Sequence, residues 1–167
     1  MKNYFLINED GTAFMECYKR DGTTKGLVLI DSNKVQEISA YKWHISKNYA
    51  CAHIKGDKIS LHRFLLSGKI IDHINRDKLD NRVSNLREVS RAQNTINREK
   101  IRKKTSSSYK GVSFHSRDRV WTAYITVNKK RISLGIYKSE IDAARTYDRA
   151  AIKYFGEYAC LNFYSSS

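Results

Sequence analysis

The hydrophobic pattern between Val112 and Phe155 changes from a period of two to a helical period, and this change restricts the fold more than any other feature. Three successive segments alternate apolar and polar side chains, and they span 112–115, 121–127 and 131–136. Such alternation is typical of strands that bury one face. Ser139 then opens a segment with a capping-box-like start, and Gly156 is a natural stop. The pattern predicts a three-stranded antiparallel sheet packed on one helix.

The predicted helix carries an apolar stripe of small and aromatic side chains that suits the apolar face of the sheet. The members of the stripe are Ala143, Ala144, Tyr147, Ala150, Ala151, Tyr154 and Phe155. The apolar face of the last two strands is assigned to Trp121, Ala123, Ile125, Val127, Ile132, Leu134 and Ile136. We interpret the aromatic members of the stripe as core rather than a cofactor site, and Trp121 as core rather than a stacking platform.

A second informative segment, 70–97, combines short apolar runs with polar residues. An apolar pair runs directly into Asp72 and His73, a polar loop follows, and 86–89 suits a returning strand. A serine is then placed to cap a helix that carries Asn94. The order strand, loop, strand and helix would bring Asp72, His73 and Asn94 together.

These residue types suit the hydrolysis of a phosphodiester, which requires a base for the water and a cation for the developing charge. The ordinary pKa of histidine, about 6.5, leaves His73 largely neutral near pH 7. Asp72 and Asn94 offer hard oxygens that suit Mg²⁺.

The spacing of these residues resembles the HNH endonuclease family, in particular the phage and intron-encoded homing type whose last motif position is Asn. The resemblance implies that Asp72 and Asn94 hold one divalent metal, that His73 activates water, and that Asn85 orients the loop and the imidazole. It also implies Mg²⁺ as cofactor, with Mn²⁺ as the alternative and no zinc. Because this ligand set is sparse, we expect the metal to arrive or tighten with DNA.

Turn chemistry explains other polar residues of this loop, because Asn and Asp bond their own backbone; these are Asn75, Asp77, Asp80 and Asn81. Upstream, the segment 62–66 resembles the His-Arg-hydrophobic run that precedes the active centre in phage-type relatives. We interpret His62 as a packed structural residue rather than one that faces phosphate. Arg63 and Arg87 are candidates for phosphate contacts, and each is equally well explained as a solvated charge.

The N-terminal region, 1–61, predicts short strands separated by turns. A buried strand is expected at 26–31 and a short helix at 32–39. A hairpin is expected within 43–54, with 59–61 added as a third strand. We assign this region to the nuclease domain.

The region 109–163 resembles the Apetala2/ethylene-response-factor DNA-binding domain. The resemblance rests on Tyr-Lys-Gly-Val at its start, Ser-Leu-Gly-Ile-Tyr in the third strand, Ala-Ala-Arg-Thr-Tyr-Asp-Arg-Ala-Ala-Ile in the helix and the closing Leu-Asn-Phe. It implies a sheet that lies in the major groove, with the helix behind it. The residues implied to face DNA are Lys110, Ser113, His115, Tyr124, Thr126, Arg131 and Ser133.

The chain departs from the plant members of that family on the face that reads bases. Plant members carry Arg at several positions that are Ser113, His115 and Thr126 here, and Trp in place of Ser133. The bidentate Arg–guanine contacts that discriminate bases are therefore mostly missing. Arg131 is the matched guanidinium that we expect to contact a base or a phosphate.

The charge balance agrees with a nucleic-acid partner. The chain has 31 Lys and Arg against 17 Asp and Glu, a formal net charge of +14, which attracts a polyanion. The segment 98–108 is basic and then serine-rich. Arg102, Lys103 and Lys104 within it would neutralise DNA phosphates, although a tether held open by self-repulsion explains the same composition.

Other features exclude further classes of protein. Three widely spaced cysteines without a Cys-x-x-Cys pair do not form a zinc ribbon or a disulfide framework. The apolar start is too short for a signal peptide, and no apolar run has the length of a membrane helix. We expect a cytoplasmic protein, and the resemblance implies a bacterial or phage-infected cell.

The sequence thus predicts an α+β protein with an HNH nuclease domain at 1–97, a linker at 98–108 and an Apetala2-like DNA-binding domain at 109–163. The predicted function is a site-specific DNA endonuclease of homing type that nicks double-stranded DNA, acting as a monomer, with a dimer left open. The alternative is a non-catalytic DNA-binding protein that retains the HNH fold. Because the motif residues are all present, we favour the enzyme.

Overall fold

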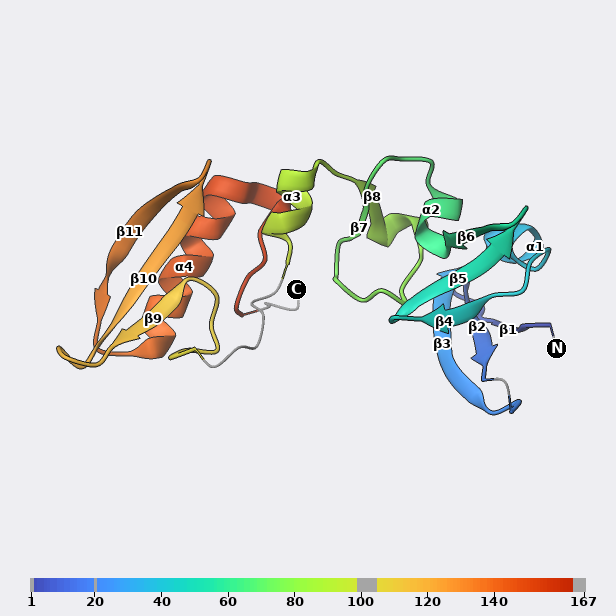
Figure 1. Cartoon of the computed structure of the whole chain (residues 1–167), viewed down its shortest axis with the longest axis horizontal. Helices are drawn as coiled ribbons and strands as arrows, with labels where there is room; N and C mark the ends of the chain where they lie inside the picture. The colour runs from blue at the N-terminus through green and yellow to red at the C-terminus, as the bar shows by residue number, and fades with distance from the viewer. Residues whose placement is uncertain (1, 20, 99–104, 164–167) are drawn as a thin grey trace. The chain divides into compact units, whose positions relative to one another are not determined.

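The computed structural model describes residues 2–19, 21–98 and 105–163 of the chain (Figure 1). The chain divides into two compact units, Met1–Arg91 and Ala92–Ser167. Arg102, Lys103 and Lys104 lie outside the described residues, and their proposed contacts with DNA stay predictions.

The first unit contains two three-stranded antiparallel sheets, one two-stranded ladder and short helices. The first sheet consists of β1 (Tyr4–Ile7), β2 (Thr12–Tyr18) and β3 (Thr24–Asp31). The second consists of β4 (His44–Ser46), β5 (Tyr49–Ile54) and β6 (Asp57–Ser60), and the ladder pairs β7 (Ile71–His73) with β8 (Leu86–Glu88). The helical elements are a 3-10 turn (Ser32–Lys34), α1 (Val35–Ile38), α2 (Leu61–Leu65) and a second 3-10 turn (Val83–Asn85).

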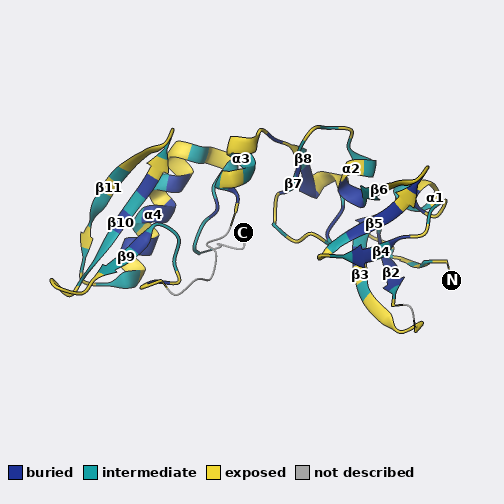
Figure 2. Cartoon of the chain, viewed as in Figure 1, coloured by how far each residue is buried: buried dark blue, intermediate teal, exposed yellow. Residues whose placement is uncertain are grey.

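One hydrophobic core holds the two sheets of this unit together. Alternate residues of β2 and β3 are fully buried, and Trp43, Ile38 and Leu61 pack into the same cluster. Figure 2 shows buried stretches in β2 and β5, whereas the first half of β3 is largely exposed. The Trp43 indole donates to the Ile38 carbonyl at 2.8 Å, so the buried ring has its polar group satisfied. Burying side chains of this size contributes about 1.5–3 kcal/mol each to stability.

The strand expected at 59–61 differs from the structure at its last residue. β6 ends at Ser60, and Leu61 begins α2. Leu61, Phe64 and Leu65 recur at helical spacing, and all three belong to the core of the unit or pack against it. Burial of these three side chains therefore favours a helical turn over a longer strand.

The second unit contains a three-stranded antiparallel sheet and its helix. The strands β9 (Val112–His115), β10 (Val120–Val127) and β11 (Lys130–Tyr137) have the order β11-β10-β9. The main helix is α4 (Glu140–Phe155), followed by a 3-10 turn (Gly156–Tyr158). All of α3 (Arg91–Ile96) except its first residue also belongs to this unit. The predicted sheet packed on one helix is confirmed.

The ends of α4 follow the predicted pattern. The Ser139 hydroxyl accepts a hydrogen bond from the Asp142 backbone N–H at 3.3 Å, and Gly156 follows the last helical residue with a φ of 54°. The helix packs on the sheet through Ala143, Ala144, Tyr147 and Ala151, which are buried. Side chains at i, i+3 and i+4 share one helix face, which is why these residues meet the sheet.

Two residues that the sequence assigned to this core are exposed. Tyr154 is 43 % exposed, because it lies in the last turn of α4 at the edge of the buried stripe. Ile136 is 69 % exposed, because β10 and β11 change register between Ala123 and Tyr124. Ala123 pairs with Gly135 and Tyr124 pairs with Ser133, so one extra residue of β11 reverses the alternation beyond it. The core assignment of Trp121 is confirmed, since Trp121 packs against the buried cluster.

The C-terminal segment of the second unit is fastened to α4 and to the start of the sheet. The buried Asp148 carboxylate accepts hydrogen bonds from the backbone N–H groups of Asn162 and Phe163 at 2.8 and 2.9 Å. The Asn162 side chain accepts from the Lys110 backbone N–H at 2.6 Å and donates to the Lys110 carbonyl at 3.0 Å.

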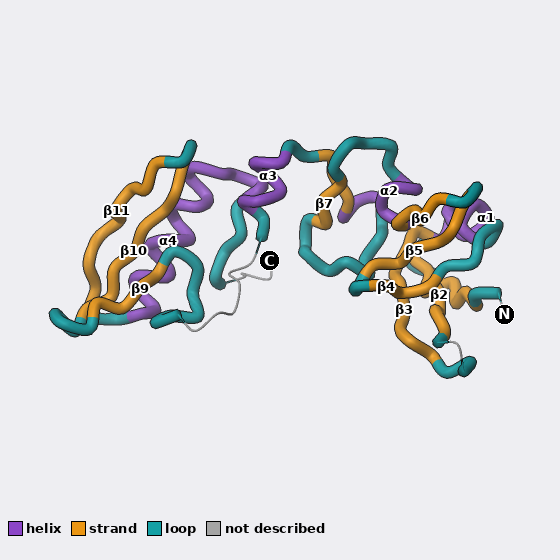
Figure 3. The backbone as a smooth tube through the Cα atoms, viewed as in Figure 1, coloured by secondary structure: helices purple, strands orange, loops and turns teal. Residues whose placement is uncertain are grey.

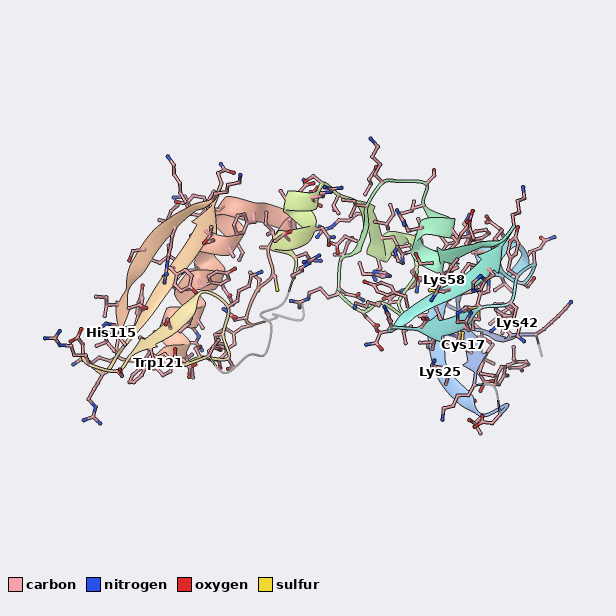
Figure 4. The ribbon with its side chains drawn as sticks, viewed as in Figure 1. Cys17, Lys25, Lys42, Lys58, His115 and Trp121 are labelled. Carbon is pink, nitrogen blue, oxygen red and sulfur yellow. The ribbon has the colours of Figure 1, made fainter. Side chains whose placement is uncertain are left out.

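The cysteines and the helices of the described residues bear on the zinc-ribbon, disulfide-bonded and membrane classes of protein that the sequence analysis considered. Cys17, Cys51 and Cys160 are buried free thiols, and burial raises the pKa of Cys17, labelled in Figure 4, to about 11. Among the helices described, none combines the length and the apolar character needed to cross a bilayer.

Gly111→Ala is expected to destabilise the second unit by about 3 kcal/mol, through overpacking and backbone strain. Gly111 has a φ of +73°, and an added Cβ would overlap the Tyr147 ring and lie 2.6 Å from the Tyr124 carbonyl oxygen. Gly56→Ala is the matched control, because Gly56 has a φ of +91° but no heavy atom within 4 Å of an added Cβ. Urea denaturation of the two variants would measure the difference, and equal losses would contradict the packing argument.

Candidate active site and DNA-binding face

Asp72 and His73 are consecutive residues of β7, so their side chains point to opposite faces of this short strand. Asp72 pairs with Arg87 across the ladder, and His73 pairs with Leu86. The Arg87 guanidinium lies 3.4 Å from the Asp72 carboxylate, and both side chains are largely buried. Arg87, a candidate for phosphate contact, is therefore located next to the proposed metal ligand.

Asn85 closes the loop between the two strands, which Figure 3 traces after β7. Its side-chain oxygen accepts from the Asn75 backbone N–H at 3.0 Å. Its amide nitrogen donates to the Asn75 side-chain oxygen at 2.9 Å and to the Asp80 carbonyl at 2.8 Å. The Ile74 N–H also donates to the Asn85 carbonyl at 2.8 Å. One buried amide thus fixes both ends of the loop.

Asp80 is the second fixed point of the loop. The Arg82 guanidinium donates to both carboxylate oxygens, at 2.9 and 2.7 Å, and the Asn75 amide donates at 2.8 Å. Burial alone would raise the pKa of Asp80, but the hydrogen bonds and charge of Arg82, with the bond from Asn75, hold the pKa below its ordinary value. A carboxylate held in this way is charged at neutral pH.

The N-terminal sheet supports the same loop from outside the motif. The Leu29 N–H donates to the Leu79 carbonyl at 2.8 Å, and the Asn81 N–H donates to the Leu29 carbonyl at 2.7 Å. The Asp31 carboxylate accepts from the Val83 N–H at 2.7 Å. The strand-rich region before the motif therefore forms part of the scaffold of the candidate site.

His73 lies in a buried aromatic cluster. It is 5 % exposed, and its ring centroid lies 5.0 Å from that of His62 and 6.2 Å from that of Tyr49. Burial lowers the pKa of His73 below its ordinary value, against the opposing effects of the Asn81 hydrogen bond and the Asp72 charge. The same cause, together with the His73 charge, lowers the pKa of His62 to about 4. Both rings are neutral near pH 7.

Asn81 is a contact of His73 that the sequence analysis did not identify. Its side-chain oxygen lies 3.4 Å from Nε2 of His73, and the residue is 1 % exposed. The sequence explained Asn81 by turn chemistry, and it does bond the Lys78 carbonyl at 3.2 Å. No local pattern distinguishes an Asn that only forms a turn from one whose side chain also reaches a histidine.

Other polar residues around this aromatic cluster have partners within the protein. The packed interpretation of His62 agrees with its burial and with its contact to the Ser60 hydroxyl at 3.3 Å. The Arg63 guanidinium donates to the Lys69 carbonyl at 3.2 Å. Lys78 places its ammonium 4.6 Å above the centre of the Tyr49 ring, so a cation stands over an aromatic neighbour of His73.

Asn94 lies on α3, in the second unit, and its pairing with Asp72 around a metal stays a prediction. Within the residues that the structure describes, no group of three His, Cys, Asp or Glu side chains is placed to hold a metal ion. A cation held by one carboxylate and one amide needs water and phosphate oxygens to complete its shell. Such a donor set fits a hard ion such as Mg²⁺.

The second unit presents a polar face on the side of the sheet opposite α4. The register groups Ser113 with Thr122 and Ile136, Tyr124 with Ser133, and Thr126 with Arg131. Thr126, Arg131, Ser133 and His115 are exposed, and Tyr124 is half-buried.

Two of the residues expected to face DNA have polar partners within the protein. His115 lies at the end of β9, where its Nδ1 lies 3.1 Å from the Asp118 carboxylate (Figure 4). The Lys110 ammonium donates to the carbonyls of Ile96 and Arg98, both at 2.7 Å. Lys110 therefore bonds carbonyls at the C-terminal end of α3, and its contact with DNA stays a prediction.

Comparison with known families identifies two regions of the chain. A family model described as HNH endonuclease matches residues 67–96, and one described as AP2 domain matches residues 107–157. The first match contains Asp72, His73, Asn85 and Asn94. The second contains β9, β10, β11 and α4.

Whole-protein comparison gives relatives of two kinds. The chain is 32 % identical over 170 residues to an uncharacterized HNH endonuclease of Acanthamoeba polyphaga mimivirus, covering 96 % of this chain and 85 % of that protein. It is 44 % identical over 64 residues to APETALA2-like protein 2 of Oryza sativa, covering 37 % of this chain and 14 % of that protein. An AP2-like ethylene-responsive transcription factor of Arabidopsis thaliana is 43 % identical over 58 residues.

Asp80→Asn is expected to lower the free energy of unfolding by about 2 kcal/mol at pH 7, because it weakens charge-assisted bonds to Arg82. Since the folded protein holds the pKa of Asp80 below its ordinary value, this stabilisation is present above about pH 4 and is lost as the pH falls further. Urea denaturation would measure the free energy of unfolding of the wild type and of Asp80→Asn at pH 7 and pH 3.5. The difference between the two proteins should be smaller at pH 3.5 than at pH 7.

Asp77→Asn provides the control for this measurement. Asp77 is exposed and lies in the same loop, where its carboxylate accepts from the Leu79 N–H at 2.9 Å. Asp77→Asn should lower the free energy of unfolding by less than Asp80→Asn does. A loss at Asp80 that does not change with pH would contradict the charged role of this carboxylate.

Proposed function

This chain belongs to the HNH endonuclease family and carries an AP2 domain after the nuclease motif, and on this basis we propose that it is a site-specific DNA endonuclease that hydrolyses phosphodiester bonds. The observation that supports catalysis most directly is the pair Asp72 and His73, with a buried, neutral imidazole in a scaffold fixed by Asn85. The AP2 domain and the formal net charge of +14 support DNA as the partner.

His73 is the proposed general base. An amide oxygen only accepts hydrogen bonds, so the contact between Asn81 and Nε2 favours the tautomer in which Nε2 carries the ring proton. Nδ1 then carries the lone pair that takes a proton from water. Because burial favours the neutral ring, His73 is in the form that accepts a proton at neutral pH.

The proposed cofactor is one Mg²⁺ ion, with Mn²⁺ as a substitute, held by Asp72 and Asn94. HNH nucleases typically use a divalent metal, which when bound neutralises charge on the phosphate and on the leaving oxygen. The carboxylate and amide oxygens of these two side chains suit such a hard ion.

We further propose that the protein is of the homing type and nicks DNA as a monomer. One HNH centre contains one general base, so it cuts one strand in one binding event. A double-strand break would need a second copy or a second encounter. We also propose that the protein acts in the cytoplasm of a bacterial or phage-infected cell.

One observation favours a second candidate function, a DNA-binding protein without catalysis. Asp72 already has a cation beside it, because the Arg87 guanidinium lies 3.4 Å from its carboxylate. If this ion pair persisted on DNA, the carboxylate would serve structure rather than metal binding. Cleavage that depends on added metal distinguishes the two candidates.

His73→Ala is expected to abolish cleavage and to leave DNA affinity nearly unchanged, because affinity resides mainly in phosphate and groove contacts elsewhere. The assay incubates the full chain with supercoiled plasmids carrying candidate target DNA, with Mg²⁺ and then with a chelator. His53→Ala is the matched control, since His53 is exposed on β5. Parallel loss of affinity and activity in His73→Ala would argue against the role of His73 as base.

Arg131→Ala is expected to weaken binding to the preferred site by about 1–3 kcal/mol if its guanidinium reads a base. Lys130→Ala removes the same charge from the adjacent exposed position, which points to the opposite side of β11. Binding isotherms on a preferred and an unrelated duplex would compare the two variants. An equal loss on both duplexes would assign Arg131 to phosphate instead.

A further inference from the structure

The Arg131 side chain is stacked on an aromatic ring on the proposed DNA-binding face. Its guanidinium carbon lies 3.5 Å from the centre of the Tyr124 ring. This is the contact distance of non-bonded heavy atoms, so a steeply tilted guanidinium would press a nitrogen into the ring. The guanidinium therefore lies over the face of the Tyr124 ring and in contact with it.

The stack is a consequence of strand register. Thr126 pairs with Arg131 and Tyr124 pairs with Ser133, so Tyr124 and Arg131 are diagonal neighbours on one face. The register shift between Ala123 and Tyr124 produces this arrangement. Without the shift, Tyr124 would pair with Leu134, and Arg131 would change faces relative to the ring.

Tyr124 is the fixed member of the pair. It is half-buried, and its backbone N–H donates to the Gly111 carbonyl at 2.8 Å. Arg131 is exposed and, within the described part of the chain, its guanidinium has no carboxylate partner. Thr126 and Ser133, its neighbours on this face, are neutral and form no ion pair with the guanidinium. The aromatic ring is therefore what restricts the long, otherwise adaptable Arg131 side chain.

We propose that Tyr124 is a positioning residue that holds the Arg131 guanidinium flat against the sheet, with its donor edge turned outward to a paired acceptor on DNA. Such an acceptor is the O6/N7 edge of guanine or a pair of phosphate oxygens. Restricting Arg131 before binding reduces the side-chain entropy lost in the complex. This inference rests on the proposed DNA binding and adds a residue that determines how well one contact is made.

The position of Tyr124 matters because this face has few long cationic side chains. Short polar side chains occupy the neighbouring outward positions, namely Ser113, Thr122, Thr126 and Ser133. Each of these hydroxyls can donate only one hydrogen bond to an acceptor on a base or phosphate, and none carries a charge. The orientation of one guanidinium therefore carries much of the directional recognition by this sheet.

A double-mutant cycle with the full chain tests the proposal. The probe is a fluorescent duplex selected by the wild-type chain from a randomised library in the presence of a chelator, and anisotropy measures its Kd. Tyr124→Leu keeps apolar bulk without a ring face and should weaken binding about threefold to fivefold. Tyr124→Phe should retain wild-type affinity, and Tyr124→Leu should have no further effect in the Arg131→Ala background.

Tyr154→Leu is the matched control, because Tyr154 is an exposed tyrosine of α4, and it should leave binding unchanged. If Tyr124→Leu lowers the Tm of the protein, phenylalanine and pentafluorophenylalanine at position 124 replace it. They have similar shapes, but the second has an electron-poor face and should bind the probe more weakly.

Three results would overturn the proposal. Equal weakening by Tyr124→Leu with and without Arg131 would mean that Tyr124 contacts DNA or supports the fold itself. Weakening by Tyr124→Phe equal to that by Tyr124→Leu would assign the effect to the hydroxyl. Unchanged binding by Arg131→Ala would remove the contact that Tyr124 positions. A wild-type chain that selects no duplex would instead refute the proposed function, on which the inference depends.

Discussion

The hydrogen bonds of the Asn85 side chain are the constraint on which the candidate active site depends. A loop of polar residues joins β7 to β8, and such a loop has many conformations unless buried partners select one. Asn85 bonds the backbone and side chain of Asn75 and the carbonyl of Asp80, so the two ends of the loop are held together. The strand that carries Asp72 and His73 is thereby kept in register with β8. The N-terminal sheet adds backbone bonds from Leu29 to the far side of the loop, which link the HNH motif to the main core of the unit.

Burial around His73 then gives the site its chemical character. The rings of Tyr49 and His62 exclude water from the imidazole, and this burial lowers the pKa of both histidines. A neutral imidazole has a ring nitrogen that can accept a proton, which is what a water-activating base requires. The ion pair between Asp72 and Arg87 opposes metal binding, because the carboxylate already has a cation of the protein beside it. A bound metal and a phosphate group would each offer a new partner to one member of this pair.

The register shift in the second unit determines the composition of the face that we propose to bind DNA. It brings Arg131 and Ser133 to the face that also carries Tyr124, and it turns Ile136 outward. The polar face therefore combines one stacked guanidinium with short hydroxyl side chains and one exposed aliphatic group. The AP2 domains of the plant relatives match this chain at 43–44 % identity, while the sequence departs from the plant pattern at Ser113, Thr126 and Ser133. The fold is thus shared, and the side chains at the positions proposed to face DNA differ from those of the plant pattern.

The sequence by itself determined the two families, the sheet and helix of the second unit, the capping of α4 by Ser139 and the core role of Trp121. These are local properties, because strand alternation, helix spacing and motif spacing are written in neighbouring residues. Only the tertiary structure decided that Leu61 begins a helix, that Ile136 and Tyr154 are exposed, and that Asn81 reaches the imidazole of His73. Leu61, Ile136 and Asn81 depend on partners elsewhere in the fold: a core that favours a helical turn, a bulge set by strand pairing, and a loop folded against β3. The exposure of Tyr154 follows from its place at the edge of the buried stripe of α4. A pattern of neighbouring residues contains no information about which distant surface will bury a side chain.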